Sequence, residues 1–148
     1  MMLSCSCREN KLLKVFLVND SNNQQSKECS ELKSKLNSFL NGEKVDFKEN
    51  IDWNLLNLTN FQKKVLLETY KIPYGEIKTY KEIANAINSR AYRAVGNALN
   101  KNPIAIAIPC HRVIGSNRRL TGFELGLELK KQLLINEGHE IVKDKLIK

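Results

Sequence analysis

Two signals for the start of a helix constrain the fold of this chain more than any other feature of its sequence. Thr59-x-x-Gln62 and Thr79-x-x-Glu82 both have the capping-box spacing, in which a threonine hydroxyl accepts a hydrogen bond from the backbone three residues later. Pro73-Tyr74-Gly75 provides a turn between the two predicted helices. The second helix ends near Asn88-Ser89, and a third extends over 91–101. The second and third helices are short and are joined by a brief turn, which predicts a helix-turn-helix.

The third helix is unusual in its small residues. Ala91, Ala94, Gly96 and Ala98 surround Arg93 and Asn97. A glycine inside a helix costs about 1 kcal/mol relative to alanine, so something is expected to pack closely against Gly96. Periodicity alone favours tight packing in the core, and the alternative is a helix pressed into a DNA groove.

The N-terminal part has the pattern of a small α/β domain. Leu12–Val18 is predicted to be a strand, and 19–26 a polar loop. An amphipathic helix follows, stopped by Asn41-Gly42, and 43–58 is predicted to be a linker. The apolar positions of the helix are Leu32, Leu36, Phe39 and Leu40. We therefore place an abbreviated N-terminal domain at 1–57 and a second domain at 58–148.

The second domain is predicted to be mainly helical, with a winged-helix-like helix-turn-helix. Ile104–Ile108 alternates with period two and predicts a strand ended by Pro109, which places Cys110 at a strand end. A last helix is expected over 125–137, closed by Gly138.

The net positive charge of the chain comes entirely from this second domain. The net charge is +8, and residues 1–60 carry equal numbers of basic and acidic side chains. A polyanion is the natural partner of such a distribution, although a solvated basic face is the plain alternative. The sequence contains no apolar stretch of bilayer length and no secretory signal, so we expect a cytoplasmic protein without membrane contacts.

In a cytoplasmic protein the four cysteines are expected to be mostly reduced thiols. Cys5, Cys7 and Cys29 could hold a structural zinc, but no CxxC pair or nearby histidine supports such a site. We therefore expect no cofactor.

Cys110-His111-Arg112 is the candidate for chemistry. A thiol with an ordinary pKa near 8.5 needs a base or a positive field to become a useful nucleophile, and this tripeptide offers both. Neighbouring residues of a strand point to opposite faces, so His111 can act on Cys110 only in an irregular turn or through a water. The pair alone is equally compatible with a buried thiol beside an ordinary histidine.

From Phe61 to Gly138 the chain resembles the C-terminal domain of the O6-alkylguanine-DNA alkyltransferases. The matching stretches are Tyr74-Gly75-Glu76, Thr79-Tyr80-x-x-Ile83-Ala84, Arg93-Ala94-Val95-Gly96-Asn97-Ala98-Leu99, Asn102-Pro103, Ile108-Pro109-Cys110-His111-Arg112-Val113-Ile114-Gly115, Thr121-Gly122-Phe123, Gly126-Leu127, Lys130, Leu133-Leu134 and Glu137-Gly138. Several motifs in the same order and at similar spacing make a chance match improbable.

The resemblance implies DNA repair by direct reversal of damage. Cys110 takes the alkyl group from O6-alkylguanine, and from O4-alkylthymine, irreversibly and once per molecule. His111 acts as the base through a water, Glu137 orients the imidazole, and Asn102 braces the turn that carries the thiol. The partner is double-stranded DNA, bound by a monomer that can act cooperatively.

The same resemblance implies base flipping from the minor-groove side. Tyr80 contacts the guanine edge, Arg93 fills the gap left by the flipped nucleotide, and Arg118 and Arg119 contact phosphates. The other implied substrate or DNA contacts are Ala94, Gly96, Asn97, Ala98, Arg112, Val113, Ser116, Phe123, Glu124 and Lys130. The pattern departs from the family at Phe123, where tyrosine is usual, and at Glu124-Leu125, which replace small residues; these changes put the accepted alkyl size in doubt.

Three other functions compete with this one. A non-catalytic relative that flags alkylated bases would lack the reactive cysteine. A winged-helix regulator would leave the cysteine motif without a role. A cysteine hydrolase would explain neither the basic segment nor the small-residue helix.

Overall fold

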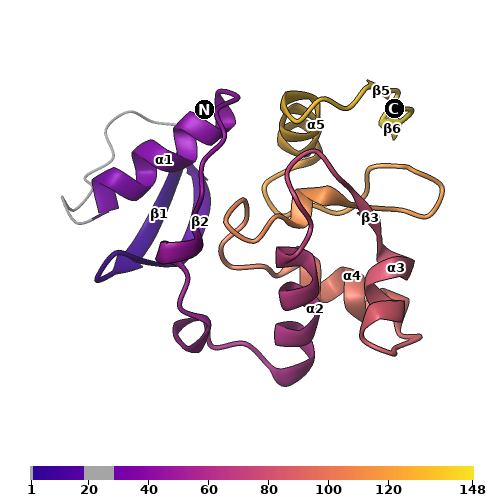
Figure 1. The fold of residues 1–148 in the computed structure, drawn as a ribbon, viewed down its shortest axis with the longest axis horizontal. Coiled ribbons are helices and arrows are strands. Elements are labelled where there is room, and N and C mark those ends of the chain that lie inside the picture. Colours follow the sequence, from indigo (N-terminus) through magenta and orange to yellow (C-terminus); the bar gives the residue numbers. More distant parts are fainter. Residues whose placement is uncertain (1, 19–28) are drawn as a thin grey trace.

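The computed structural model describes residues 2–18 and 29–148. Figure 1 shows an N-terminal lobe, in which a helix covers a two-stranded sheet, beside a larger and mainly helical lobe. The N-terminal elements are β1 (Met2–Arg8), β2 (Lys11–Val18) and α1 (Ser30–Leu40). This arrangement confirms the expected small α/β part followed by a mainly helical part; the exact boundary at 57/58 stays a prediction.

The N-terminal sheet is an antiparallel hairpin with one strand more than the sequence predicted. β1 pairs with β2 from Met2 opposite Val18 to Arg8 opposite Lys11. Glu9 and Asn10 both adopt positive φ, as a two-residue hairpin turn requires. Leu3, Cys5 and Cys7 alternate with Ser4, Ser6 and Arg8, so the pattern of a strand is present in the sequence and was missed. The predicted loop at 19–26 lies outside the described residues.

The helix α1 ends where the sequence indicates. Leu32, Leu36 and Phe39 are buried, Asn41 is the C-terminal cap, and Gly42 has a φ of +101°. Two short 3-10 turns, η2 (Lys48–Asn50) and η3 (Trp53–Leu56), then lead along the linker.

The prediction of reduced cysteines is wrong for one pair. Cys7 and Cys29 form a disulfide that joins β1 to the residue before α1. Their separation of 22 residues gave no local signal, since pairing depends on how α1 lies on the hairpin. Cys5 and Cys110 are free thiols.

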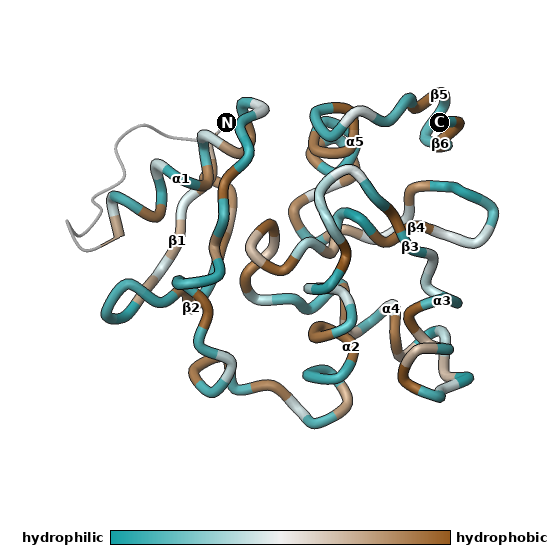
Figure 2. Tube along the Cα trace, in the orientation of Figure 1, coloured by the Kyte–Doolittle hydropathy of each residue, from teal (hydrophilic) through white to brown (hydrophobic). Residues whose placement is uncertain are grey.

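Three helices form the first half of the larger lobe. They are α2 (Asn60–Tyr70), α3 (Tyr80–Ala86) and α4 (Tyr92–Asn100). Both predicted starts are confirmed: the hydroxyl of Thr79 accepts from the N–H of Glu82 in a complete capping box, and Thr59 accepts from Gln62 at 3.1 Å. In Figure 2 hydrophobic and hydrophilic residues alternate along these helices, as amphipathic packing requires.

The predicted strand at Ile104–Ile108 is wrong. The segment is a series of buried turns, with Ile106 at a φ of +79° and the N–H of Ile108 donating to the carbonyl of Ile104 at 3.0 Å. Its alternating pattern misleads because every one of its residues is buried, so period two marks no exposed face. Cys110 therefore opens a 3-10 turn, η4 (Cys110–Arg112), instead of ending a strand.

Short elements complete the fold. They are β3 (Lys78–Thr79), which pairs in parallel with β4 (Val113–Ile114), then α5 (Leu127–Asn136) and the hairpin of β5 (Ile141–Val142) and β6 (Lys145–Leu146). One apolar cluster runs from Leu3 in the N-terminal lobe to Leu133 in α5, so the two lobes share a core. No helix in the described ranges is long and apolar enough to cross a bilayer.

Candidate functional site

The thiol of Cys110 is buried and braced by one amide. The side-chain nitrogen of Asn102 donates to Cys110 Sγ at 3.2 Å and to the carbonyl of Ile108 at 2.8 Å, while its oxygen accepts from the N–H of Ile104 at 3.0 Å. Asn102 thus holds both ends of the buried turn and contacts the sulfur itself. This is the bracing position that the sequence predicted for it.

Burial dominates the acidity of this thiol. It raises the pKa of Cys110 to about 11, although the hydrogen bond from Asn102 and the charge of Lys130 act in the opposite direction. In the protein without its substrate, desolvation of the anion therefore outweighs the neighbours that favour the thiolate, and activation of Cys110 by His111 stays a prediction.

His111, Arg112 and Glu137 form a buried network beside the thiol. The imidazole Nε2 lies 2.6 Å from Glu137 Oε2, and Arg112 Nε donates to Oε1 at 2.8 Å. The N–H of Gly75 also donates to Oε1 at 2.9 Å. Three elements distant in sequence therefore meet at one carboxylate, that of the residue at the C-terminal cap of α5.

The charges of this network follow from its pKa values. Burial would raise the pKa of Glu137, but the hydrogen bonds from His111, from Arg112 and from the backbone of Gly75 lower it to about 2. Burial lowers the pKa of His111, and this outweighs the opposite effect of Glu137. A carboxylate next to a neutral imidazole requires the shared proton to be on Nε2. Nδ1 is then an unprotonated nitrogen, and it is buried without a hydrogen-bond partner in the structure.

Four of the expected substrate or DNA contacts are buried in the protein without DNA. Lys130 is fully buried and donates to the carbonyls of Val113 at 2.7 Å and Thr121 at 2.9 Å; burial lowers its pKa to about 8. Arg112 is committed to Glu137 and to the carbonyl of Ile72. Val113 and Ala98 are buried in the core. The charged side chains of Lys130 and Arg112 are satisfied by partners inside the protein, and contact of these four residues with substrate or DNA stays a prediction.

One face of α4 opens into a cavity of about 440 Å³. It is lined by Tyr80, Tyr92, Arg93, Gly96, Asn97, Asn100, Thr121 and Gly122. No atom would meet a Cβ at Gly96 within 4 Å, so the interpretation of Gly96 as a core-packing residue is wrong. The structure brings together Tyr80, Arg93 and Asn97 as predicted; Tyr92, Asn100 and Thr121 were missed, although Asn100 follows Arg93 and Asn97 at helical spacing on the polar face of α4.

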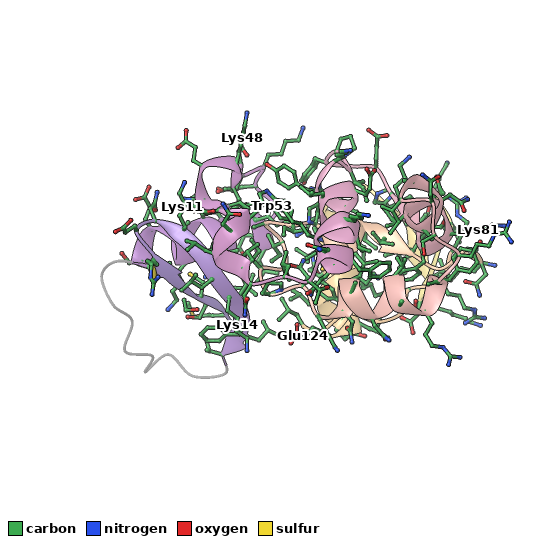
Figure 3. The ribbon with its side chains drawn as sticks, turned by 90° about the horizontal axis from the view of Figure 1, so that it is seen from below. Lys11, Lys14, Lys48, Trp53, Lys81 and Glu124 are labelled. Atoms are coloured by element: carbon green, nitrogen blue, oxygen red, sulfur yellow. A yellow bond between two sulfur atoms is a disulfide. The ribbon has the colours of Figure 1, made fainter. Side chains whose placement is uncertain are left out.

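The remaining expected contacts surround this face. Ala94 is half-buried on α4, and Ser116, Arg118 and Arg119 are exposed on the loop after β4. Phe123 is buried, while Glu124 is exposed in the loop before α5, near enough for its charge to raise the pKa of Cys110. In Figure 3 the side chain of Glu124 lies between the two lobes, and that of Lys81 at the start of α3 extends away from the body.

The proposed zinc ligands are not available as a set. Cys7 and Cys29 are consumed by their disulfide, which removes the thiolates that zinc would need. Among residues 2–18 and 29–148, no group of three or more cysteine, histidine or carboxylate side chains has a geometry that could hold a metal ion.

The C-terminal lobe thus combines a buried free thiol, an imidazole bonded to a carboxylate and an open face on α4. Residues 60–139 match the family model of the 6-O-methylguanine DNA methyltransferase, DNA binding domain, and the chain belongs to this family. The family predicted from the sequence is thereby confirmed.

Curated relatives and solved structures agree with this assignment. A methylated-DNA–protein-cysteine methyltransferase of Methanosarcina barkeri is 62% identical over 56% of this chain, but the match spans only about half, 53%, of that relative. One of Sulfolobus acidocaldarius is 39% identical over 93% of this chain and 78% of its own length. The crystal structure of Mycobacterium tuberculosis OGT in complex with DNA superposes with a TM-score of 0.78 at 36% identity, covering 91% of this chain and 85% of that one.

Proposed function

We propose that the protein repairs alkylated DNA by transferring the alkyl group of O6-alkylguanine, once and irreversibly, to Cys110. The observation that carries this proposal is the buried sulfur held by Asn102 beside an imidazole whose Nδ1 is an unused base. The names of the relatives from M. barkeri and S. acidocaldarius support the same chemistry.

The transfer is a single displacement. A bond forms between Cys110 Sγ and the alkyl carbon as the bond from that carbon to guanine O6 breaks, and its electron pair leaves on the base. The thiol proton passes to Nδ1 of His111 through a water, and Glu137 stabilises the imidazolium that results. Because the thioether has no route back to a thiol, each molecule reacts once.

Tyr80 is the group we assign to the leaving base. In the protein without DNA its hydroxyl donates to the carbonyl of Thr121 at 2.8 Å, and burial raises its pKa. A turn of the hydroxyl toward guanine would deliver a proton as the base departs, and solvent replaces that proton. Lys130 donates to the same carbonyl, so the acceptor that Tyr80 gives up remains satisfied.

DNA binding is assigned to a helix-turn-helix made of α3 and α4, with the loop after β4 as a wing. The open face of α4 offers Ala94, Gly96 and Asn97 to a minor groove, and small side chains allow the backbone to come close. Arg93, which is exposed, would fill the stack after the damaged base is flipped out. Arg118 and Arg119 would contact phosphates without regard to sequence.

The substrate pocket is assigned to Ser116, Phe123 and Glu124 around the thiol. A backbone N–H near Glu124 would donate to guanine O6, a contact that needs no particular side chain. O4-alkylthymine is the second substrate we propose. No cofactor takes part in this scheme, and the protein acts as a monomer that can bind DNA cooperatively.

The test incubates the protein with a DNA duplex that contains O6-methylguanine labelled in its methyl group. We expect about one label per protein molecule, on the peptide that contains Cys110, and no transfer by Cys110→Ala. Cys5→Ser is the matched control, because Cys5 is the other free buried thiol, and it should transfer normally.

Two results would overturn the proposal. Tight binding of the damaged duplex without transfer would favour a non-catalytic reader of alkylated bases. Binding that depends on an undamaged sequence would favour a winged-helix regulator.

A further inference from the structure

The N-terminal lobe reaches the catalytic network through one aromatic side chain. Phe39, in the last turn of α1, is only 5% exposed, and its ring centroid lies 5.9 Å from that of His111. The two rings are inclined by 64°, which is an edge contact of the kind that aromatic pairs prefer. No motif that identifies the family contains Phe39, since the matched model begins at residue 60.

The same turn of α1 is fastened to the end of α5 that supplies Glu137. The side chain of Asn136 donates to the carbonyl of Leu40 at 2.9 Å. Tyr74 packs edge-on against Phe39 at 6.1 Å and donates its hydroxyl to the carbonyl of Asn136 at 3.2 Å. Phe39 is therefore held in register with the imidazole and with its carboxylate by contacts on both sides.

We propose that Phe39 is a positioning residue for His111, through which the N-terminal lobe completes the active site of the C-terminal one. This inference rests on the proposed function, in which Nδ1 of His111 receives the thiol proton. Phe39 acts through its contact with His111, by fixing the ring plane and by keeping water away from the imidazole.

The contact fits that role for a physical reason. Glu137 holds His111 only through Nε2, and a half-turn of the ring about the Cβ–Cγ bond would put Cε1 in the place of Nε2 and Cδ2 in the place of Nδ1, which breaks the bond to Glu137. A phenyl ring blocks this rotation and carries no group that could bond Nδ1, so the base stays free. The charged groups that act on His111 are Glu137, Arg112 and Lys130, and α1 contributes none of its own.

The experiment compares Phe39→Leu with Phe47→Leu in the full chain. Phe47 is buried to the same extent, 5% exposed, but its ring contacts the ammonium group of Lys35 and not His111. Both variants lose a buried aromatic ring from the N-terminal lobe, so a loss of stability alone affects both. Thermal unfolding of each variant checks that it is folded.

Two readouts separate positioning from general stability. The nitrogen NMR signals of the His111 ring, followed against pH, should show one protonated Nε2 in the parent and in Phe47→Leu. In Phe39→Leu we expect mixed tautomers and a higher imidazole pKa, because water gains access to the ring. The rate of methyl transfer should fall roughly tenfold at pH 7, part of the 10²–10⁴-fold that a positioned base supplies. It should fall further below about pH 6.5 in this variant only.

The inference and the proposed function can fail separately. If the parent transfers the methyl group and Phe39→Leu matches Phe47→Leu in rate, pH profile and NMR signals, Phe39 has no positioning role. If the parent transfers nothing, the proposed function fails, and the NMR comparison still decides whether Phe39 orders His111.

Discussion

At the scale of single residues, the site is a neutral thiol and a neutral base placed next to a strong pair of opposite charges. Glu137 and Arg112 carry the charges, and they are satisfied by each other, by Gly75 and by the carbonyl of Ile72. Cys110 and His111 are kept uncharged by burial. Such a site stores no thiolate; its reactivity depends on moving a proton when the substrate arrives.

Glu137→Gln should destabilise the protein by roughly 3 kcal/mol at neutral pH, because the pKa of this carboxyl falls from 4.5 to about 2 on folding. A lowered pKa stabilises the folded state fully above pH 4.5, and the stabilisation is lost as the pH falls from 4.5 toward 2. Urea unfolding of parent and variant across this range measures it. The exposed Glu140→Gln is the control. A difference between parent and Glu137→Gln that did not shrink on acidification would contradict this origin.

At the scale of elements, caps and faces explain what the helices do. The complete capping box at Thr79 starts α3 where Tyr80 must stand, in contact with Thr121. In contrast, the side chain of Gln62 donates to the carbonyl of Lys101, so Thr59 caps α2 without the reciprocal bond. The Gln62 contact ties the start of α2 to the end of α4 instead.

Gly96→Ala should change stability and DNA binding in opposite directions. The added methyl group meets no atom within 4 Å and raises helix propensity, so we expect about 0.5–1 kcal/mol of stabilisation. The same methyl group stands on the open face of α4, where it should weaken binding to duplex DNA. Thermal unfolding and a binding titration at fixed salt test the two effects.

Ser34→Ala is the matched control for this pair of effects. Ser34 is exposed on α1, away from the α4 cavity, and its replacement also raises helix propensity. It should leave DNA binding unchanged. Unaltered affinity in Gly96→Ala would remove α4 from the proposed DNA interface.

At the scale of the whole molecule, the two lobes form one unit around a shared core. The N–H of Val15 in β2 donates to the carbonyl of Pro103, next to the asparagine that braces the thiol. Phe39 reaches His111 from the other end of the same lobe. A substitution that disturbs the packing of the N-terminal lobe should therefore disturb the site through these direct contacts.

Reduction of the Cys7–Cys29 disulfide should cost about 3 kcal/mol, since the bond closes a loop with a sequence separation of 22 residues. The expected result is a lower urea midpoint for the parent in reductant than without it. Cys7→Ser cannot form the disulfide, so its urea midpoint should equal that of the reduced parent and should be the same with and without reductant. Equal midpoints for the oxidised parent and this variant would show that the disulfide does not stabilise the fold.

The sequence by itself determined whatever depends on neighbouring residues: the caps at Thr59 and Thr79, the ends of α1 and α4, and the motif around Cys110 that identifies the family. Local hydrogen bonds and turn preferences act within a few positions, so they can be seen in the printed chain.

Only the tertiary structure decided which of the motif's side chains face inward. Lys130 and Arg112 are charged residues whose partners the sequence does not show, and both are buried and bonded inside the protein; the alternation at Ile104–Ile108 lies in buried turns. His111 meets a carboxylate 26 residues away and an aromatic ring from α1. These outcomes depend on how distant segments pack, because burial and pairing are properties of the assembled core and not of any stretch of chain.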